Sequence, residues 1–451
     1  MVRLHDTARG RVAELARRQP GRVSMYVCGP TVYDEPHVGH GRFALVFDVL
    51  RRYLSWSGNE VTYVSNITDV DDKIIDRARR EGRSPADVAA QYERSWYDAT
   101  DRLGILRPDH DPHATAYVGA MVDWVDGLVA AGAAYETGDG VYLATDAVEG
   151  YGLLARQPLD TLRAGARVAV GEQKRSPLDF ALWKKVAPGE ASWPSPWGQG
   201  RPGWHTECVV MALDLLGDGF DLHGGGMDLA FPHHENERAQ AVAAGRRFAS
   251  AWAHNGFVEV GGEKMSKSLG NFTTLPELLG ATDARAYRLV VLQSHYRAPV
   301  EVTPASLEAA SAALAGLDDF ARRRPELPGG PADPDALARF TAAMDDDLDT
   351  PAAMAVLFDA VRAANRAVDA GDPAAAGSLG AAVVAMGEAV GLALAAGEEV
   401  PEAVAAALAQ REAARAGRDW AAADAIRDDL AGQGWIVEDA PSGPRAHRRR
   451  P

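Results

Sequence analysis

Cysteine is scarce in this sequence, and long apolar runs are missing from it. Only two cysteines, Cys28 and Cys208, occur among the 451 residues, which excludes a disulfide-rich secreted scaffold and favours a cytoplasmic protein. No stretch approaches the ~18 consecutive apolar residues that a membrane span needs, so we expect no membrane partner. The first ten residues carry His5, Asp6 and Arg9 and no apolar core, so we expect no secretory signal there.

Basic residues are outnumbered by acidic ones. The chain has 47 Lys and Arg against 63 Asp and Glu, a formal net charge of −16. This balance argues against a protein that coats nucleic acid over its whole surface, although it leaves room for a local basic patch. Hydrophobic residues at 47% and charged residues at 24% are ordinary for a folded chain. The length exceeds what one core supports and predicts two or three domains.

The first two thirds of the chain are predicted to be α/β. Four segments are predicted strands: residues 23–27, 61–64, 220–223 and 252–258. Residues 43–54 have apolar side chains at helical spacing, so a helix separates the first two strands. Strand, helix and strand form a βαβ unit with parallel strands. We therefore predict a doubly wound, Rossmann-type sheet interrupted by an insertion over residues 115–199, with ligands beyond the carboxyl ends of the strands.

The last third differs in composition. Residues 324–331 are dense in Pro and Gly and predict a linker. Beyond it, residues 353–370 and 404–430 are rich in Ala with helical spacing. A last helix carries Trp420, Ala423, Ile426 and Leu430 on one face and ends near residues 432–434, and residues 435–437 suggest a strand. The arginine-rich tail 445–450 is either a patch that meets RNA phosphates or a disordered surface tail. Every motif described below precedes the linker, so we predict that the two parts are separable in function.

One motif joins the first predicted strand to the first predicted helix. It begins at Cys28 and ends in His37-Val38-Gly39-His40. His37 and His40 flank the helix start, where backbone N–H groups and two imidazoles would stabilise phosphate charge. The alternative is a capped helix with two surface histidines. The position directly after a strand favours the phosphate site.

Two further motifs are suited to a nucleotide. In the run Lys264-Met265-Ser266-Lys267-Ser268, two lysines three residues apart suit a polyphosphate whose charge shifts during a reaction. The alternative is a solvated lysine pair. In the glycine-rich run from His223 to Asp228, glycines such as Gly225 allow backbone contact with a nucleotide, and Asp228 could bind ribose hydroxyls or an amino group. The alternative there is an ordinary glycine-rich turn.

Four residues form a candidate metal site: Cys28, Cys208, His233 and Glu237. His233 and Glu237 are four residues apart, so on a helix they share one face. Two thiolates, an imidazole and a carboxylate suit zinc. His234 and Glu235 are rival ligands, although on a helix they point elsewhere. The alternative is two buried thiols and a surface His–Glu pair, since the distance between the cysteines in the chain gives the site no support.

Together these motifs resemble class I aminoacyl-tRNA synthetases, and their surroundings resemble the cysteinyl-tRNA synthetase family. The His-x-Gly-His and Lys-Met-Ser-Lys-Ser pair, in that order, carries the resemblance to the class. The resemblance to the family is carried by four blocks: residues 26–34, 66–73, 203–208 and 231–237. It covers almost the whole chain, densely before the linker and more loosely after it.

The resemblance implies a role for each candidate residue. One zinc per chain would be held by Cys28, Cys208, His233 and Glu237, and the substrate's thiolate would join the metal with Glu237 as the adaptable ligand. The implied catalytic residues are His37 and His40 on the ATP phosphates and Lys264 and Lys267 on the departing pyrophosphate. ATP would also meet Gly225 and Asp228. The residues implied near the amino acid are Gly29, Thr68, Trp204 and Asp228.

The resemblance also implies a reaction. Such an enzyme would be an ATP-dependent ligase that activates cysteine to cysteinyl-adenylate, with Mg²⁺ on the ATP, and releases pyrophosphate. It would then pass the cysteinyl group to the terminal adenosine of tRNA(Cys). Zinc prefers thiolate, and this preference would separate cysteine from serine where pocket shape alone discriminates poorly. We expect a monomer that works in the cytoplasm.

The implied domains follow the composition of the chain. They are two halves of a catalytic domain (1–114 and 200–305), the insertion (115–199), a helical tRNA-binding bundle (306–400) and a small anticodon-binding unit (401–451). Two features depart from the family's usual pattern and concern only tRNA contact: Asp349, where Asn is usual before Thr-Pro, and the tail from Pro444 to His447.

Two other interpretations compete with this one. A ligase that joins cysteine to an amino sugar would share the metal and phosphate motifs, but it would lack a full anticodon-binding region. A non-catalytic tRNA-binding paralogue should have lost metal or phosphate residues, and all of them are present here.

Overall fold

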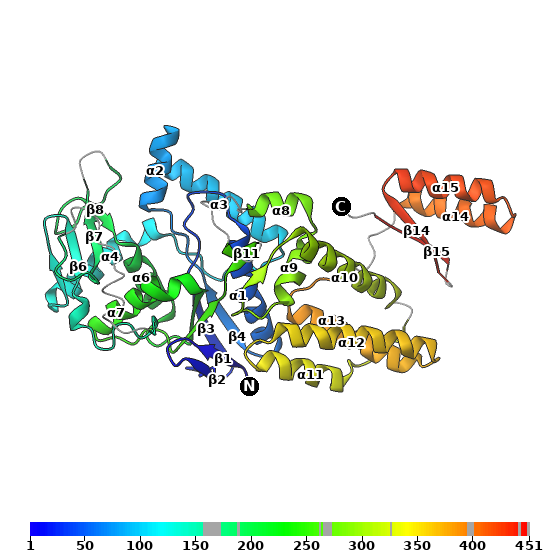
Figure 1. Ribbon diagram of the computed structural model, residues 1–451, viewed down its shortest axis with the longest axis horizontal. Coiled ribbons are helices and arrows are strands. Elements are labelled where there is room, and N and C mark those ends of the chain that lie inside the picture. Colours follow the sequence, from blue (N-terminus) through cyan, green and yellow to red (C-terminus); the bar gives the residue numbers. More distant parts are fainter. Residues whose placement is uncertain are drawn as a thin grey trace.

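The computed structural model describes residues 1–156, 173–186, 190–260, 263–264, 273–324, 327–394, 401–440 and 443–448. The α/β part lies at the centre of an elongated molecule, with the insertion at one end and the C-terminal helices at the other (Figure 1). This order matches the predicted succession of an interrupted α/β domain, a helical bundle and a small last unit.

A four-stranded parallel sheet, in the order β10-β9-β3-β4, forms the centre of the α/β part. Its strands are β3 (Arg22–Val27), β4 (Glu60–Val64), β9 (Leu222–Gly226) and β10 (Ala251–Asn255). Helix α1 (Val38–Trp56) crosses from β3 to β4, as predicted. The chain goes outward from β3 to β4 and returns to β9 on the other side of β3. Doubly wound sheets bind ligands at such a switch point, beyond the carboxyl ends of the strands.

The predicted strand 252–258 is in fact two strands in different sheets. β10 ends at Asn255, and β11 (Val258–Val260) pairs with β12 (Glu263–Lys264) and β13 (Val300–Glu301). The chain turns at Gly256. A Cβ atom at that position would come within 2.6 Å of the carbonyl oxygens of Arg297 and Ala298, so the close approach requires glycine.

Other elements surround the two sheets. A hairpin at the N-terminus is formed by β1 (Arg3–Asp6) and β2 (Arg11–Glu14). The remaining helices of this part are α2 (Asp72–Glu81), α3 (Pro85–Arg102), α6 (Trp204–Leu216), η3 (Met227–Leu229), η4 (Ala230–His234), α7 (Glu235–Ala243), α8 (Leu275–Ala281), α9 (Ala284–Leu292) and α10 (Pro304–Arg323).

The insertion is a small antiparallel sheet with its own core. Its elements are η1 (Ala114–Tyr117), α4 (Val118–Ala130), β5 (Ala134–Glu136), β6 (Gly140–Leu143), η2 (Thr145–Ala147), β7 (Phe180–Lys185) and β8 (Gly200–Pro202). The buried side chains of Val125, Val141, Leu182 and Trp183 belong to this core. The last strand of the sheet lies just beyond residue 199, where the sequence placed the end of the insertion.

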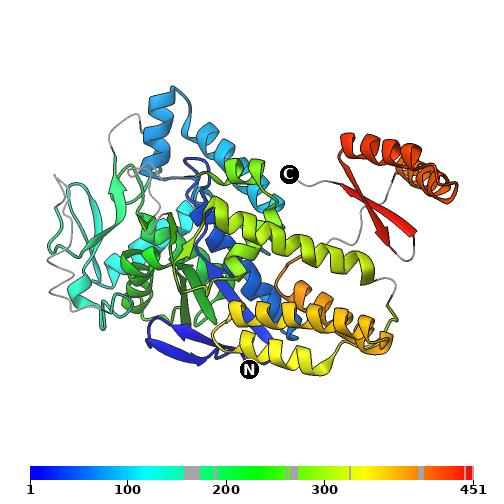
Figure 2. The same ribbon diagram turned by 45° about the vertical axis from the view of Figure 1, so that its right-hand side comes forward.

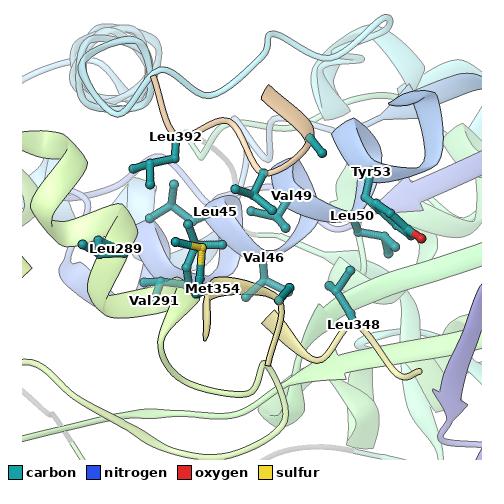
Figure 3. Packing of buried hydrophobic residues seen from close by; sticks show 14 of the residues in the cluster. Leu45, Val46, Val49, Leu50, Tyr53, Leu289, Val291, Leu348, Met354 and Leu392 are labelled. Atoms are coloured by element: carbon teal, nitrogen blue, oxygen red, sulfur yellow. The ribbon is translucent and has the colours of Figure 1, made fainter. Parts of the chain in front are cut away.

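The bundle shares its core with the catalytic part. It consists of α11 (Pro334–Asp345), α12 (Thr350–Asp369) and α13 (Pro373–Ala389). Figure 3 shows Leu348 and Met354 of the bundle in one buried cluster with Val46 and Leu50 of α1 and Leu289 of α9. One core spans the linker, so the two parts share their packing, and their separation in function at residues 324–331 stays a prediction. Cutting there would expose these apolar side chains to water.

The last unit has a separate, smaller core. Helices α14 (Glu402–Ala416) and α15 (Trp420–Gly432) cover a hairpin of β14 (Trp435–Ala440) and β15 (Gly443–Arg448). Five buried residues form the core: Val404, Leu408, Leu430, Trp435 and Ala446. The unit lies apart from the bundle in both ribbon views (Figures 1 and 2).

The predicted last helix, with Trp420 to Leu430 on one face and an end near residue 432, is confirmed as α15. It is separate from α14 because Arg418 has a left-handed φ of 60° and Asp419 caps α15 by accepting from the backbone N–H of Ala422. The alternative of a disordered tail is wrong for residues 445–448, which belong to β15, where Arg445 lies opposite Glu438; residues 449–450 lie outside the described residues. Among the helices of the described residues, none is long and apolar enough to cross a membrane.

Candidate functional site

The start of α1 carries the His-x-Gly-His motif at the carboxyl edge of the sheet. His37 is the N-cap residue: its Nδ1 accepts from the backbone N–H of His40 at 3.2 Å, and the Nδ1 of His40 accepts from the N–H of His37 at 3.3 Å. The two rings stack with centroids 3.7 Å apart. A ring whose Nδ1 accepts carries its proton on Nε2, so Nε2–H is the atom with which each imidazole would donate to an anion. The capped helix and the phosphate site are therefore compatible descriptions of one structure.

The segment with the lysine motif returns to this helix start. The backbone N–H of Val38 donates to Thr273 O at 3.2 Å, and the N–H of Leu275 donates to Pro36 O at 2.6 Å. Lys264 is the last residue of β12, and Lys267 lies outside the described residues. The two ends of the lysine segment are thus fixed by β11 and by the residues beside His37.

The four predicted metal ligands come together. Their donor atoms lie within 4.8 Å of one another although the residues come from three separate segments, and all four residues are buried. The Sγ atoms of Cys28 and Cys208 are 3.7 Å apart, and Oε1 of Glu237 is 3.5 Å from Cys28 Sγ and 3.0 Å from His233 Nε2. Zn–S bonds of ~2.3 Å in a tetrahedron place two sulfurs about 3.8 Å apart, so the thiol spacing fits zinc.

The electrostatics of this cluster also suit a divalent cation. Burial raises the pKa of the Cys28 thiol well above its usual value, whereas the hydrogen bond from Cys28 lowers the pKa of Cys208 to about 6. Burial alone would lower the pKa of His233, but the Glu237 carboxylate raises it to about 10. Cys28 and His233 therefore hold protons in the absence of a metal. Zinc would displace both protons and gain a thiolate and a neutral imidazole as ligands.

A second group of donors shares two of these residues. Cys28 and Glu237 also lie within reach of His223 and His234. His223 Nε2 is 2.7 Å from the other carboxylate oxygen of Glu237, and its Nδ1 is 3.1 Å from Tyr26 O. His223 therefore holds the carboxylate from behind, as outer partners of metal ligands do. We favour the set with two sulfurs, because zinc binds thiolate strongly.

Three histidines around the cluster were misplaced or missed from the sequence: His234, His205 and His223. His234 was expected to point elsewhere, but its ring stacks on His223 with centroids 4.2 Å apart. Glu235 does point elsewhere, toward the backbone N–H of Leu154. His205 was missed: its Nδ1 is 2.9 Å from Nδ1 of His233 and orients that ring. His223 was quoted only for its glycine-rich run. Its position opposite Tyr26 depends on the register of β9 against β3, which the sequence does not give.

Gly29 and Thr68 lie beside the metal cluster. The backbone N–H of Gly29 donates to Asn66 Oδ1 at 2.9 Å, and Asn66 Nδ2 donates to Thr68 Oγ1 at 3.1 Å. Asn66 Oδ1 is also 3.6 Å from Cys208 Sγ. A Cβ atom on Gly29 would lie 1.7 Å from Asn66 O, so only glycine fits there. These contacts form a buried polar group beside Cys208, of a size and polarity that suit a small amino acid.

Glu207 completes this polar group and was not predicted. Thr68 Oγ1 donates to Glu207 Oε2 at 3.0 Å, and the carboxyl group is fully buried. Burial raises the pKa of Glu207 well above its usual value. No sequence pattern marked this residue, because a glutamate one position before Cys208 looks like a solvated helix residue.

Trp204, Gly225 and Asp228 border the site from other sides. Trp204 is partly exposed and stacks on the ring of His233, with centroids 4.0 Å apart. Gly225 is buried near the end of β9, where a Cβ atom would lie 2.8 Å from Cε1 of His234. Asp228 is exposed in η3, directly after β9. All three thus stand at the carboxyl edge of the sheet, where a nucleotide and a small substrate would meet.

The fold, together with the match of residues 14–312 to a class I catalytic domain, is that of a class I aminoacyl-tRNA synthetase. Two solved structures share the fold at low sequence identity. The chain resembles Mycobacterium tuberculosis methionyl-tRNA synthetase in complex with methionyl-adenylate with a TM-score of 0.61 and 15% identity, covering 82% of this chain and 90% of that one. It resembles Agrobacterium radiobacter LeuRS with a TM-score of 0.63 and 13% identity, covering 84% and 85%.

Sequence comparisons narrow the class to a family. The family model for the class I (C) catalytic domain of tRNA synthetases matches residues 14–312, a DALR domain matches 339–395, and the cysteinyl-tRNA ligase anticodon binding domain matches 397–444. The cysteine–tRNA ligase of Alkalilimnicola ehrlichii is 47% identical over 98% of this chain and 99% of its own. That of Halorhodospira halophila is 44% identical over the whole of both chains. The chain belongs to the cysteine–tRNA ligase family.

Membership in this family settles the class of reaction. The chain is an ATP-dependent ligase that joins an amino acid to tRNA, and its substrates are tRNA, the amino acid and ATP. The match of the last unit to an anticodon-binding domain decides against the amino-sugar ligase interpretation, which expected no such region.

Proposed function

We propose that this enzyme selects cysteine through zinc held by Cys28, Cys208, His233 and Glu237. The observation that carries the proposal is the convergence of these four buried donors within 4.8 Å. Zinc bound there would supply a soft Lewis acid that prefers sulfur to oxygen and favours the ionised thiol. The carboxylate would be the exchangeable ligand, since His223 can retain Glu237 through its second oxygen when the first is released.

The chain's own residues would position the amino acid. The polar group made by Gly29, Asn66 and Thr68 lies beside Cys208 and offers a hydroxyl and an amide to the polar end of a small substrate. Trp204 would form the opposite, apolar wall. If the substrate's thiol points at the four proposed metal ligands, its carboxylate can face the start of α1. Holding reactants in this way supplies much of the rate of such a reaction.

Activation would take place at the start of α1. The cysteine carboxylate attacks the α-phosphate of ATP, and pyrophosphate leaves with the electron pair of the broken P–O bond. Nε2–H of His37 and His40 would donate to phosphate oxygens, and Lys264 and Lys267 would stabilise the charge that develops on pyrophosphate. Gly225 and Asp228 would contact the nucleoside, and Mg²⁺ would accompany the phosphates. The terminal ribose hydroxyl of tRNA(Cys) would then take the cysteinyl group and release AMP.

We also propose where the enzyme works and in what form. Both cysteines are free thiols, as a reducing cytoplasm keeps them. One chain holds every residue named above, so a monomer would suffice. The domain boundaries expected from the sequence stay part of this proposal, with the anticodon read by residues 401–451.

The decisive experiment is ATP–pyrophosphate exchange with each amino acid in turn, followed by charging of tRNA. Cysteine alone should support exchange, and the product should be cysteinyl-tRNA(Cys). Exchange with serine at a comparable rate would contradict selection through a metal. Zinc analysis of protein purified without chelator should give one ion per chain. Full activity in protein that contains no zinc would contradict the proposal.

A further inference from the structure

Arg42 is an arginine in the core with an unusual set of partners. It lies on α1 two residues after His40, and only 1% of its surface is exposed. Its guanidinium donates to four backbone carbonyl groups: Phe257 at 2.5 Å, Tyr296 at 3.2 Å, His295 at 3.4 Å, and Ala298. Burial lowers the pKa of Arg42 to about 10, so the group is still a cation at neutral pH. A buried cation that donates to carbonyl groups is costly, and the nearby Glu259 carboxylate offsets only part of its desolvation.

Those carbonyls belong to two segments next to the lysine loop. Phe257 directly precedes β11, the strand that leads into the lysine segment. Residues 295–298 form a turn that ends one residue before β13, the partner of β11. The backbone N–H of Gly256 donates to Tyr296 O at 2.8 Å and ties the two segments together. Arg42 therefore fixes the base of the lysine loop to the helix that carries His37 and His40.

The same turn is held from its other side by the bundle. Asp347, in the link between α11 and α12, is 4% exposed. Its Oδ1 accepts from Tyr296 Oη at 2.8 Å, and its Oδ2 accepts from Arg297 Nε at 2.8 Å. It also accepts from the backbone N–H of His5 at 2.7 Å.

The backbone at Asp347 is itself constrained. Asp347 and Leu348 have left-handed φ values of 60° and 53°, a conformation that non-glycine residues keep only when their surroundings enforce it. Leu348 is buried in the core against α1 (Figure 3). The turn at 295–298 is thus held by hydrogen bonds to Arg42 on the catalytic side and to Asp347 on the bundle side.

We propose that Arg42 and Asp347 are positioning residues that connect the tRNA-binding bundle to the lysine loop through the turn at 295–298. Neither residue is among those proposed to touch substrate. The proposal rests on the proposed function, because it assumes that the lysine loop stabilises the departing pyrophosphate. If Arg42 sets the position of that loop, its loss lowers the rate of adenylate formation and leaves cysteine binding at the metal unchanged. A purely structural role would instead lower stability at equal rate.

The first experiment measures cysteine-dependent ATP–pyrophosphate exchange for Arg42→Met and Arg42→Lys, well below their unfolding temperatures. For Arg42→Met we expect kcat to fall at least about tenfold, with the KM for cysteine within twofold and zinc content equal to wild type. Arg42→Lys should recover part of the rate, because a lysine can donate to some of the carbonyls. Arg285→Gln is the matched control: Arg285 also joins catalytic and bundle segments, through Asp318 and Ala393 O, but does not contact the turn. Its kcat should stay within twofold.

The second experiment tests the connection itself with a double-mutant cycle. Asp347→Asn removes the charge, and asparagine tolerates the left-handed backbone. It should lower kcat less than Arg42→Met does, and the double variant should be no slower than Arg42→Met alone, because both act through one turn. If Arg42→Met does not fold, Arg42→Lys replaces it in the cycle.

Two results would overturn the inference: an Arg42 variant with full kcat and normal zinc content, or a double variant whose loss is the product of the single losses. Wild-type enzyme without cysteine-dependent exchange would instead refute the proposed function, so the two failures are distinguishable.

Discussion

Glu237 and Asp439 are both carboxylates held between two nitrogen-bearing side chains, but their surroundings are opposite. Glu237 is fully buried between His223 and His233 beside two thiols. Asp439 lies at the surface of the last unit between Arg411 and Arg415, with its side chain 49% exposed. Breaking a buried pair leaves an uncompensated charge and typically costs about 3–5 kcal/mol, whereas an exposed pair contributes about 0–1 kcal/mol. One substitution in the buried cluster should therefore have a large effect on the catalytic site, whereas each exposed ion pair contributes little to the stability of the last unit.

The largest effect is expected from truncating the chain between these two regions. A chain that ends at Leu394 keeps the shared core of α1, α9 and the bundle intact, so cysteine-dependent exchange should stay within twofold of the full chain. Charging of tRNA should nearly vanish, because the unit that matches the anticodon-binding domain is gone. A chain that ends at Gly330 should lose both activities, since it exposes the apolar side chains that α11 to α13 cover. If the chain that ends at Leu394 charges tRNA efficiently, then the last unit is not needed for charging.

The next effect concerns one buried donor. Cys208→Ser replaces a soft sulfur by a hard oxygen, so zinc content should fall well below one per chain. Cysteine activation should drop by more than the roughly 10- to 100-fold that loss of an outer partner of a metal ligand costs. Discrimination against serine should weaken in parallel. Binding of tRNA, measured by filter binding, serves as the control and should not change. A variant that retains stoichiometric zinc and wild-type selectivity would remove Cys208 from the site.

A smaller effect is expected at the lysine loop. Lys267→Ala should slow adenylate formation about a hundredfold, roughly 3 kcal/mol, because one donor to a developing charge is lost. The KM for cysteine should change little, since the interaction strengthens only in the transition state. Exchange kinetics at saturating and limiting cysteine separate the two quantities. An unchanged exchange rate would show that the loop has no catalytic role.

The smallest effect tests the exposed side of the comparison. The hydrogen bond from Arg411 lowers the pKa of Asp439 to about 2, against ~3.9 in an unfolded chain. Because the folded value is the lower one, the contribution is present above about pH 4 and is lost as the pH falls toward 2. Asp439→Asn should therefore destabilise the last unit by at most about 1 kcal/mol at pH 7 and less at pH 3. Hydrogen exchange of the α14 amides measures this, and a loss of several kcal/mol would contradict the surface assignment.

Some of the site could be predicted because its candidate ligand residues lie in short sequence motifs. Cys28, Cys208, His233 and Glu237 were proposed as one cluster from their chemistry and from the family resemblance, and their donor atoms do converge in the structure. The strands β3 and β4 were predicted because β-branched and aromatic runs bounded by glycine and proline are local signals. The predicted strand 220–223 shares only Leu222 and His223 with β9, because the glycines that end β9 are not a strand signal.

Other features could not be predicted, because they arise from contacts between distant segments. His223 joins the cluster only through the register of β9 against β3, and Arg42 is defined by a turn more than two hundred residues later. The break between α11 and α12 carries no glycine, since Asp347 and Leu348 are held left-handed by their tertiary partners. The shared core across the linker was missed for the same reason: a Pro/Gly-rich segment shows where a helix stops and does not show which faces pack together.

The central claim is that the buried cluster selects cysteine by its sulfur. The most direct measurement replaces zinc with Co²⁺, which has a similar preference for nitrogen and sulfur ligands and absorbs light when bound to thiolate. Adding cysteine to the cobalt enzyme should strengthen the thiolate-to-cobalt absorption in the near ultraviolet, and adding serine at the same occupancy should not. Identical spectra with the two amino acids, or a spectrum that cysteine leaves unchanged while exchange proceeds, would contradict the account.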